Sequence, residues 1–359
     1  MTAQKRLRAA LVLLAALPTA ALAAPAVPAP SFTLTTFPKG FAAMGINYSG
    51  KVVGTFDNAA AIWSKTDFVT LSGMPGGVAY AISHRGAIVG SHDGSLFINF
   101  EQGIRGLPPP PSGLRTLVNT TWPAAIDDAD QVAGWAIGTD SNRGFLYGGG
   151  FTYQTIGTFS GEGDSYAQGM NNRGQVVGRA TTGRAGSAQH AFLYDAGRLR
   201  DLGTLPGAAS SQAFDMNERG QIVGDSGGQP FLYADGQMSA IGDPRDQTAS
   251  ARAINNAGWV VGSGNYAGGA GSPRHAFLYA DGRNFDLGTR LSGAEGWYLE
   301  AAEDINDSGQ ILAIGCKSGT GCVPVLLDPV SPIPEPGQAW MLALGVALLI
   351  GVRKGALTH

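Results

Sequence analysis

The chain has 359 residues, of which 44% are hydrophobic, 14% are charged and 54 are glycine, and its formal net charge is −3. This hydrophobic content excludes low-complexity disorder. An acidic chain without a basic run is not expected to bind nucleic acid, because that binding depends on neutralising phosphates. Many glycines and few charges are typical of a turn-rich extracellular β protein rather than of a cytosolic enzyme.

The first 23 residues have the three parts of a secretory signal peptide. Basic residues within the first eight positions precede the apolar stretch Ala9–Leu17. Ala21 and Ala23 then form a small-residue site for signal peptidase, so we expect the mature chain to begin at Ala24. A structural helix is the alternative, but the position, the basic flank and the Ala-x-Ala site favour export. Residues 24–30 form a Pro/Ala-rich linker.

The region after this linker is dominated by a motif that recurs seven times, Ala-x-x-Ile/Met-Asn-x-x-Gly-x-Val/Ile-x-Gly. Its fullest copies are Ala167–Gly178, Ala213–Gly224 and Ala251–Gly262, and weaker copies surround Asn47, Ser83, Asp127 and Asn306. Successive turn positions are 36, 44, 44, 46, 38 and 51 residues apart. A period near forty, built from short apolar runs and turn residues, is typical of a β-propeller or a related array.

One repeat indicates how the others fold. Its first two strands are predicted at Ala167–Met170 and Gln175–Gly178, with a type I turn at 171–174 that begins with Asn and ends with Gly. The third strand is predicted at His190–Tyr194 and the fourth at Leu199–Leu205. Four antiparallel strands in about forty residues make one propeller blade.

The third strand recurs in other repeats, at Gly144–Tyr147, Pro230–Tyr233 and His275–Tyr279. The fourth recurs at Asp286–Thr289. These elements, with His-Ala-Phe beginning at His190 and His275, resemble the HAF-repeat family of extracellular proteins. The resemblance covers residues 31–327 and is weakest over 80–130. It implies an extracellular location more than an activity.

The phase of the array predicts how it closes. Phe32–Phe37 precedes the first turn motif and has the character of a fourth strand, whereas the last repeat ends with its third strand at Val323–Leu327. The N-terminal strand can therefore complete the last blade and remove two exposed edges. We predict an all-β fold over residues 31–327, a seven-bladed β-propeller of four-stranded antiparallel blades closed by that strand. An open solenoid with capping repeats is the alternative.

Cys316 and Cys322 flank a short loop in the last repeat. In an oxidising compartment they can pair, which stabilises so small a loop by about 2 kcal/mol in the chain-entropy picture. A metal site would need more ligands, so we favour the disulfide. The sequence also lacks calcium loops, the usual zinc motifs and a glycine-rich phosphate loop, and therefore predicts neither a metal nor a cofactor.

One string imitates a catalytic motif. Residues 224–228 read Gly-Asp-Ser-Gly-Gly, like the nucleophile loop of chymotrypsin-like proteases. Those enzymes carry their histidine in an Ala-Ala-His-Cys setting, which this chain lacks. Gly224 is also the closing glycine of the fifth repeat. We therefore expect no catalytic residues here.

Turn lengths distinguish the two faces of the ring. The connections between strands one and two and between three and four are tight, whereas the other connections vary in length. Because loops carry function on rigid β scaffolds, we expect a ligand site on the variable face. The candidate residues are aromatic: Trp135, Tyr166, Tyr266, Trp297 and Tyr298. Beside polar groups they can bind sugars, although packing between blades is the alternative.

The C-terminal end carries a linker at 328–338 and a hydrophobic segment with a basic tail at 339–359. We predict a single transmembrane helix there, with the basic tail in the cytoplasm; a buried core helix is the alternative. Pro334, Glu335 and Pro336 followed by this segment resemble the PEP-CTERM sorting signal of Gram-negative bacteria. The resemblance implies an inner-membrane intermediate that an exosortase cleaves near the Pro-Glu-Pro motif.

Three functions are compatible with these patterns. We expect foremost an exported, non-enzymatic surface or extracellular protein that binds extracellular polysaccharide or a protein partner. A propeller hydrolase or lyase acting on glycans is the second, and it requires two acidic residues within roughly 5–10 Å on the variable face. A purely structural component of a biofilm matrix is the third.

Overall fold

The computed structural model describes residues 30–330, except 101–102, 111–120, 139, 149–151, 184–186, 243–247 and 266–273, with the backbone alone at 72–75. The predicted signal peptide, the Pro-Glu-Pro motif and the C-terminal hydrophobic segment lie outside these residues. Within them, no helix is long and apolar enough to cross a membrane.

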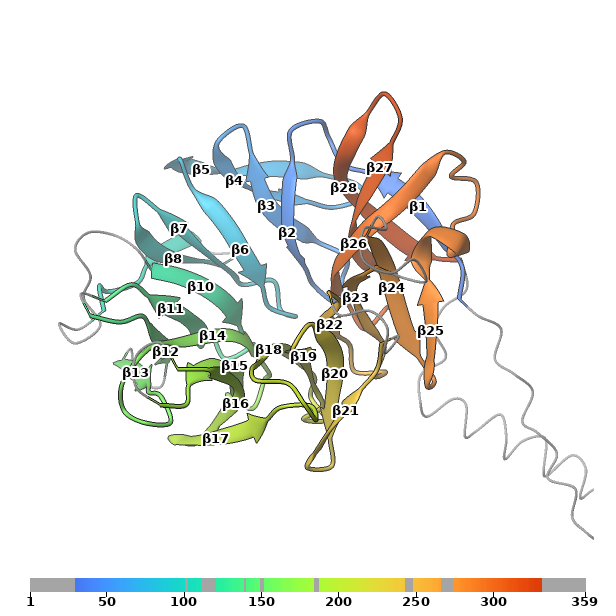
Figure 1. Ribbon diagram of the computed structural model, residues 1–359. Coiled ribbons are helices and arrows are strands. Elements are labelled where there is room, and N and C mark those ends of the chain that lie inside the picture. The colour runs from blue at the N-terminus through green and yellow to red at the C-terminus, as the bar shows by residue number, and fades with distance from the viewer. Residues whose placement is uncertain are drawn as a thin grey trace, which may run out of the picture.

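Seven four-stranded antiparallel sheets surround a central axis as blades (Figure 1). Blades 1 to 3 contain β2 Ala42–Ile46, β3 Val52–Phe56, β4 Ala59–Trp63 and β5 Phe68–Pro75; β6 Val78–Ile82, β7 Ile88–His92, β8 Ser95–Phe100 and β9 Gly103–Gly106; and β10 Thr121–Ile126, β11 Val132–Ala136, β12 Arg143–Gly148 and β13 Thr152–Ile156. Blades 4 to 6 contain β14 Ser165–Met170, β15 Val176–Thr181, β16 Gln189–Asp195 and β17 Arg198–Gly203; β18 Ser211–Met216, β19 Ile222–Ser226, β20 Gln229–Ala234 and β21 Gln237–Ala240; and β22 Ser250–Ile254, β23 Val260–Gly264, β24 His275–Ala280 and β25 Arg283–Asp286. Blade 7 contains β26 Trp297–Ile305, β27 Ile311–Lys317, β28 Gly321–Pro329 and, from the other end of the chain, β1 Phe32–Thr36.

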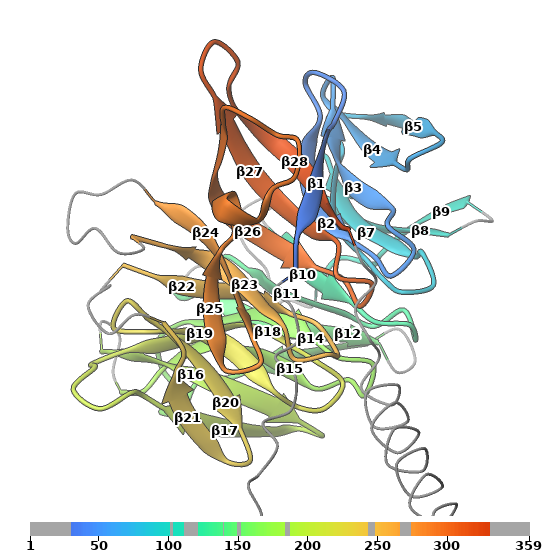
Figure 2. The same ribbon diagram turned by 90° about the vertical axis from the view of Figure 1, so that its right-hand side faces the viewer.

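Blade 7 closes the ring with both ends of the chain. Its strand order is β26, β27, β28, β1, and Phe32 of β1 lies opposite Pro329 of β28 (Figure 2). Phe32 is fully buried in a cluster with Leu287 and Leu299, so packing as well as hydrogen bonding holds the N-terminal strand. The predicted seven-bladed propeller and its closure are confirmed.

One predicted strand differs in the structure. The Asp-Leu-Gly-Thr sequence of blade 6 leaves the sheet after Asp286 and forms the short 3-10 helix η2 (Leu287–Arg290). The Asp286 side chain caps this helix by accepting a hydrogen bond from the Gly288 N–H at 2.8 Å. Aspartate favours such a cap because its short carboxylate can reach an amide two residues ahead.

The closing glycine of the motif makes room for a β-bulge in the innermost strand. In blade 4 the bulge lies between Ala167 and Gly169. A Cβ atom on Gly178 would lie 1.9 Å from the carbonyl oxygen of Tyr166, which no larger residue can tolerate. Blade 7 has Ala313 at this position, and β26 there contains two bulges instead of one.

Two adjacent apolar residues in each second strand pack against opposite neighbours, because side chains alternate across a sheet. In β15, Val176 joins a cluster with Ala133 and Ile156 of blade 3. Val177 joins a cluster with Ala213 and Phe231 of blade 5. Each blade is therefore apolar on both faces.

Hydrogen bonds from the turn residues join the blades at the face with tight turns. The Asn171 Oδ1 accepts from the N–H groups of Arg173 and Gln175, which fixes its own turn. Its Nδ2 donates to the carbonyl oxygen of Asn217, the equivalent residue of the next blade. The same link recurs from Asn217 to Asn255, Asn255 to Asn306, Asn306 to Asn47 and Asn47 to Ser83. We call this ring of turn residues the turn belt.

The turn belt lacks an asparagine in blades 2 and 3, where Ser83 and Asp127 occupy the position. The following residues supply the connection there. The Asp128 Oδ1 accepts from the Arg85 N–H at 3.0 Å, and the Asp128 N–H donates to the Asn172 Oδ1 at 2.9 Å. Together with the links between turn-belt residues, these two hydrogen bonds join every pair of neighbouring blades at the tight-turn face.

Asp127 is the weak member of the turn belt. Its Oδ2 is buried without a hydrogen-bond partner among the described residues, and burial raises the pKa of this carboxyl. We predict that Asp127→Asn stabilises the protein by about 1–2 kcal/mol at neutral pH, because an amide can donate to the next blade. The gain should shrink in acid, where Asp127 becomes neutral. Urea denaturation of the wild type and the variant, at neutral and at acidic pH, measures the difference in unfolding free energy.

The reverse exchange is the matched control. Asn217→Asp removes a donor that reaches Asn255 at 3.0 Å and Gln221 at 2.8 Å, so we expect a loss of similar size. A destabilised Asp127→Asn variant at neutral pH would contradict the role given to the belt.

Candidate ligand-binding site

Two cavities are lined by residues of the innermost strands. The turn-face cavity, of about 280 Å³, is lined by the innermost strands and by the turn belt. The loop-face cavity, of about 400 Å³, lies between blades 4, 5 and 6. Both are lined in part by Gln168, Phe214 and Arg252, residues that project where the innermost strands bulge.

The turn-face cavity contains two carboxyl groups with raised pKa values. Burial raises the pKa of Asp215 to about 7 and that of Asp304 to about 6, against an ordinary value of 3.8. Asp215 Oδ2 accepts from the Ile254 N–H and Asp304 Oδ2 accepts from the Ile46 N–H, both at 2.9 Å. Each carboxyl therefore bonds the backbone of the next blade, which is a structural role.

A pH dependence of stability follows from Asp215. Its raised pKa means that the folded protein binds the proton more tightly than the unfolded chain, so this contribution is full below about pH 4 and is lost as the pH rises through 7. We predict that Asp215→Asn reduces the fall in unfolding free energy between about pH 5 and pH 8 by up to about 3 kcal/mol. Denaturation curves at the two pH values measure this fall.

Asp281→Asn is the control, because Asp281 is an exposed turn residue that asparagine can replace. Equal pH dependence in the wild type and Asp215→Asn would show that Asp215 does not titrate as described.

The loop face carries a continuous row of aromatic and polar side chains across blades 3 to 5. Trp122 stacks on Trp135 with ring centroids 4.3 Å apart. Trp135 meets Tyr166 edge to face at 5.1 Å, and the Arg179 guanidinium lies 4.6 Å from the centre of the Tyr166 ring. We call these four residues the aromatic arc. Gln212 and Asp225 continue it through hydrogen bonds: Arg179 to Gln212, and Gln212 to Asp225.

The arc arises from one pair of positions in successive repeats. Trp122 and Trp135 are cross-strand partners, as are Tyr166 and Arg179 in blade 4 and Gln212 and Asp225 in blade 5. The corresponding pairs of the other four blades contain no aromatic residue: Ala42 with Thr55, Val78 with Ser91, Ser250 with Ser263 and Ala301 with Ile314. Only part of the ring therefore offers an aromatic surface at this level.

The predicted ligand-face residues separate into three groups. Trp135 and Tyr166 meet in the arc, and their contact also packs blade 3 against blade 4. Trp297 packs against the blade 7 core beneath Lys317, and Tyr298 is 45% exposed on the same blade, beside the paired cysteines. Tyr266 lies outside the described residues. Sequence reasoning missed Trp122, Arg179 and Asp225. Aligning the repeats would have placed them at positions equivalent to Tyr166 and Trp135, but it would not have shown their contacts.

The loop-face cavity adjoins the polar end of the arc. Its charged lining residues are Arg179, Arg252, Arg274 and Asp225. The Arg252 guanidinium lies 4.6 Å from the centre of the Phe214 ring, and Arg274 donates to the Ser263 hydroxyl. Burial raises the pKa of Asp225, although the Gln212 hydrogen bond and the two nearest arginines oppose this shift. A raised pKa in a cavity is common at functional sites.

The His-Ala-Phe elements have a structural role. His190 Nδ1 lies 3.0 Å from an Asp201 oxygen across strands β16 and β17, and His275 Nδ1 lies 3.1 Å from Asp286. Each aspartate also accepts a backbone N–H two residues ahead. The two histidines therefore anchor the third strand to the end of the fourth.

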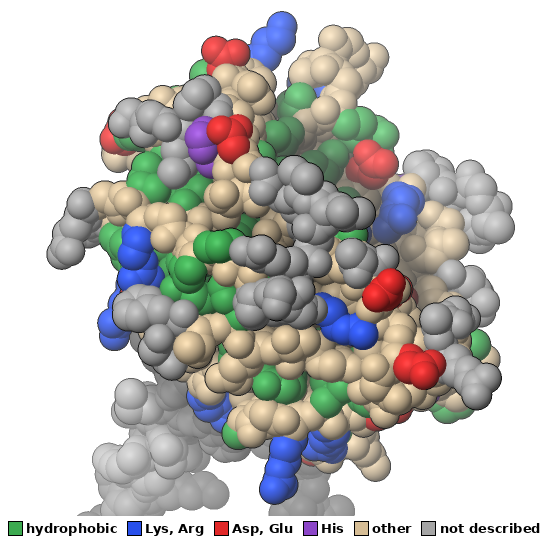
Figure 3. All heavy atoms as spheres, turned by 90° about the vertical axis from the view of Figure 1, so that its left-hand side faces the viewer, with side chains coloured by type: hydrophobic (Ala, Val, Ile, Leu, Met, Phe, Trp, Pro, Cys, Tyr) green, Lys and Arg blue, Asp and Glu red, His purple; other side chains and the backbone are tan. Residues whose placement is uncertain are grey.

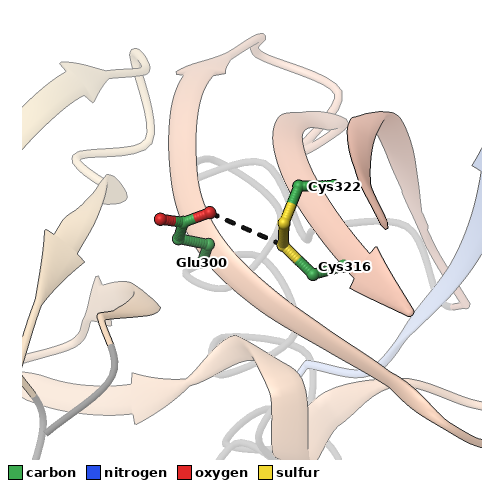
Figure 4. Close-up of side chains that lie close together, drawn as sticks. All are labelled: Glu300, Cys316 and Cys322. Atoms are coloured by element: carbon green, nitrogen blue, oxygen red, sulfur yellow. Dashed lines mark hydrogen bonds between the residues drawn. A yellow bond between two sulfur atoms is a disulfide. The ribbon is translucent and has the colours of Figure 1, made fainter. Parts of the chain in front are cut away.

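Serine and cysteine in the other singled-out motifs are likewise held structurally. Ser226 is 1% exposed, donates to the Ser210 carbonyl and accepts from the Leu205 N–H, so its hydroxyl is not placed as a nucleophile. Cys316 and Cys322 are bonded to each other across the β27–β28 hairpin, with Glu300 pointing toward them (Figure 4). Paired cysteines have no thiolate for a metal, so these three residues do not form a cation site.

Known structures with a similar architecture support the fold. The β-propeller domain of the Trilobed protease from Pyrococcus furiosus aligns over 84% of this chain and 95% of its own, with a TM-score of 0.55 and 9% identity. The extracellular domain of what is described as a hybrid two-component system in B. thetaiotaomicron aligns over 84% of this chain and 40% of its own, at 0.50 and 10%. No protein-family model and no curated protein sequence matches the chain. The chain is a seven-bladed repeat propeller.

Proposed function

We propose that this propeller is an exported, non-enzymatic binding protein that holds extracellular polysaccharide on its loop face. The aromatic arc beside the loop-face cavity carries the proposal. Flat aromatic side chains next to a few fixed polar groups are the usual composition of a small-ligand site. The arc is also built on strands, so its residues are rigid before a ligand arrives. A protein partner at the same surface is the alternative ligand.

The net acidic charge of the chain favours a partner other than nucleic acid. Basic and acidic side chains of the described residues are scattered on the side of the molecule shown in Figure 3. Nucleic-acid binding instead depends on a basic stripe or patch.

A glycan hydrolase or lyase is the second candidate, because Asp225 combines a raised pKa with a place in a cavity. It would need a second carboxylate at roughly 5–10 Å. Asp215 and Asp304 are poor acids for this purpose, since both oxygens of each carboxyl accept backbone N–H groups. A purely structural matrix component is the third candidate, and it would bind no glycan.

The two ends of the chain carry the proposed export and sorting signals. The signal peptide would direct residues after Ala23 across the inner membrane, and the hydrophobic segment at 339–352 would retain the chain there. An exosortase-type enzyme would then release it to the cell surface or the medium by cleaving near Pro334-Glu335-Pro336.

Glycan-array binding of the purified full chain tests the binding proposal. We predict that Trp135→Ala weakens binding about tenfold or more, because it removes the centre of the arc. Tyr48→Ala is the matched control, since Tyr48 is an aromatic residue 57% exposed on the opposite face. Melting curves of both variants check folding, and Trp122→Ala repeats the test. Equal effects of Trp135→Ala and Tyr48→Ala would refute the loop-face site.

Mass spectrometry of the exported protein tests the sorting proposal. We predict a new C-terminus near Pro336 in the surface form. Recovery of an intact Trp340–Val352 segment from that form would refute the cleavage, whatever the glycan experiments show.

A further inference from the structure

The loop-face cavity concentrates positive charge in an acidic protein. Among the described residues, its lining holds the guanidinium groups of Arg179, Arg252 and Arg274 and one carboxylate, that of Asp225, whereas the whole chain has a formal net charge of −3. A cavity of about 400 Å³ is within the range of sites for small ligands, roughly 300–1,000 Å³. Its charge favours an anion.

Two of these arginines are held in place by aromatic rings. Arg179 lies over Tyr166 and Arg252 over Phe214, each 4.6 Å from the ring centre. Stacking fixes the plane of a guanidinium while its N–H groups, which lie in that plane, stay able to donate. Both side chains are thus arranged before binding, which reduces the entropy lost when a ligand is bound.

These arginines also have unused donors. The Nε atoms of Arg179 and Arg252 are buried and have no hydrogen-bond partner among the described residues. Arg252 Nε forms an ion pair with Glu303 at 3.8 Å, but this distance is beyond that of a hydrogen bond. A buried donor without an acceptor costs free energy, so an acceptor bound there is stabilising.

Asp225 leaves the guanidinium groups available. Its Oδ2 accepts from Gln212 Nε2 at 2.7 Å, and Gln212 Oε1 accepts from Arg179 Nη1. The glutamine therefore stands between this carboxylate and Arg179. The cavity retains an excess of donors over acceptors.

We infer that the loop-face cavity binds the carboxylate of a uronic-acid unit, and that the polysaccharide on the aromatic arc is acidic. This inference rests on the proposed function and deepens it. Arginine recognises carboxylates through paired N–H donors. Arg179 belongs to both the arc and the cavity, so one polysaccharide chain can lie along the arc and place a carboxylate between Arg179 and Arg252.

Calorimetric titration of the full chain with oligogalacturonate and with its methyl ester tests this inference, because the two ligands differ only in the charged group. We predict tighter binding of the acid form, and weakening of that binding with salt. Arg252→Gln should lower affinity for the acid form about tenfold or more and leave affinity for the ester unchanged. Arg179→Gln should act in the same direction.

Arg290→Gln is the matched control. Arg290 also lies over an aromatic ring, Phe285, at 5.0 Å, but it does not line the cavity. Equal binding of acid and ester, or equal effects of Arg252→Gln and Arg290→Gln, would overturn the inference and leave the glycan site standing. If the protein bound a sulfated glycan in an Arg252-dependent manner and did not bind the uronate, the assignment of a carboxylate as the bound group would be overturned. Binding of no glycan would overturn both proposals.

Discussion

The structure depends on burying one polar side chain per blade at the turn between the two innermost strands. A buried polar group must be hydrogen-bonded, so this position requires acceptors for its own turn and, where possible, a donor for the next blade. Asparagine provides both on a short side chain. Five blades carry it, and the link from Asn306 to Asn47 joins the last blade to the first. The turn motif is therefore repeated because it connects blades as well as reversing the chain.

Much of the fold could be predicted from the sequence because it is local and periodic. The predicted strand Ala167–Met170 lies within β14, and Phe32–Phe37 supplies the closing strand β1. Strand ends were predicted less accurately, since the chain leaves the sheet after Asp286 and Leu287–Arg290 forms η2. An aspartate that caps a helical turn cannot be told from one that ends a strand by sequence alone. Here the helical turn forms with Leu287 buried in the core of blade 7.

The candidate site was predicted only in part for a different reason. Trp135 and Tyr166 were recognisable as aromatic residues near variable loops, but Trp122 and Arg179 act through neighbours in other strands and blades. Their importance depends on which side chains adjacent repeats bring together. The period of a repeat gives the spacing of blades along the chain but says nothing of how unlike residues at equivalent positions meet. The raised pKa of Asp215 could not be predicted from the sequence either, because it arises from burial at a bulge that the motif does not reveal.

The shared blade of the two chain ends also sets an orientation. Because Phe32 lies opposite Pro329, the segments before and after the ring depart from blade 7. In a ring of seven, blades 3 and 4 are the ones most distant from blade 7 around the circumference. Any tether that follows residue 330 would thus hold the propeller at blade 7 and leave blades 3 and 4, which carry the aromatic arc, on the far side of the ring.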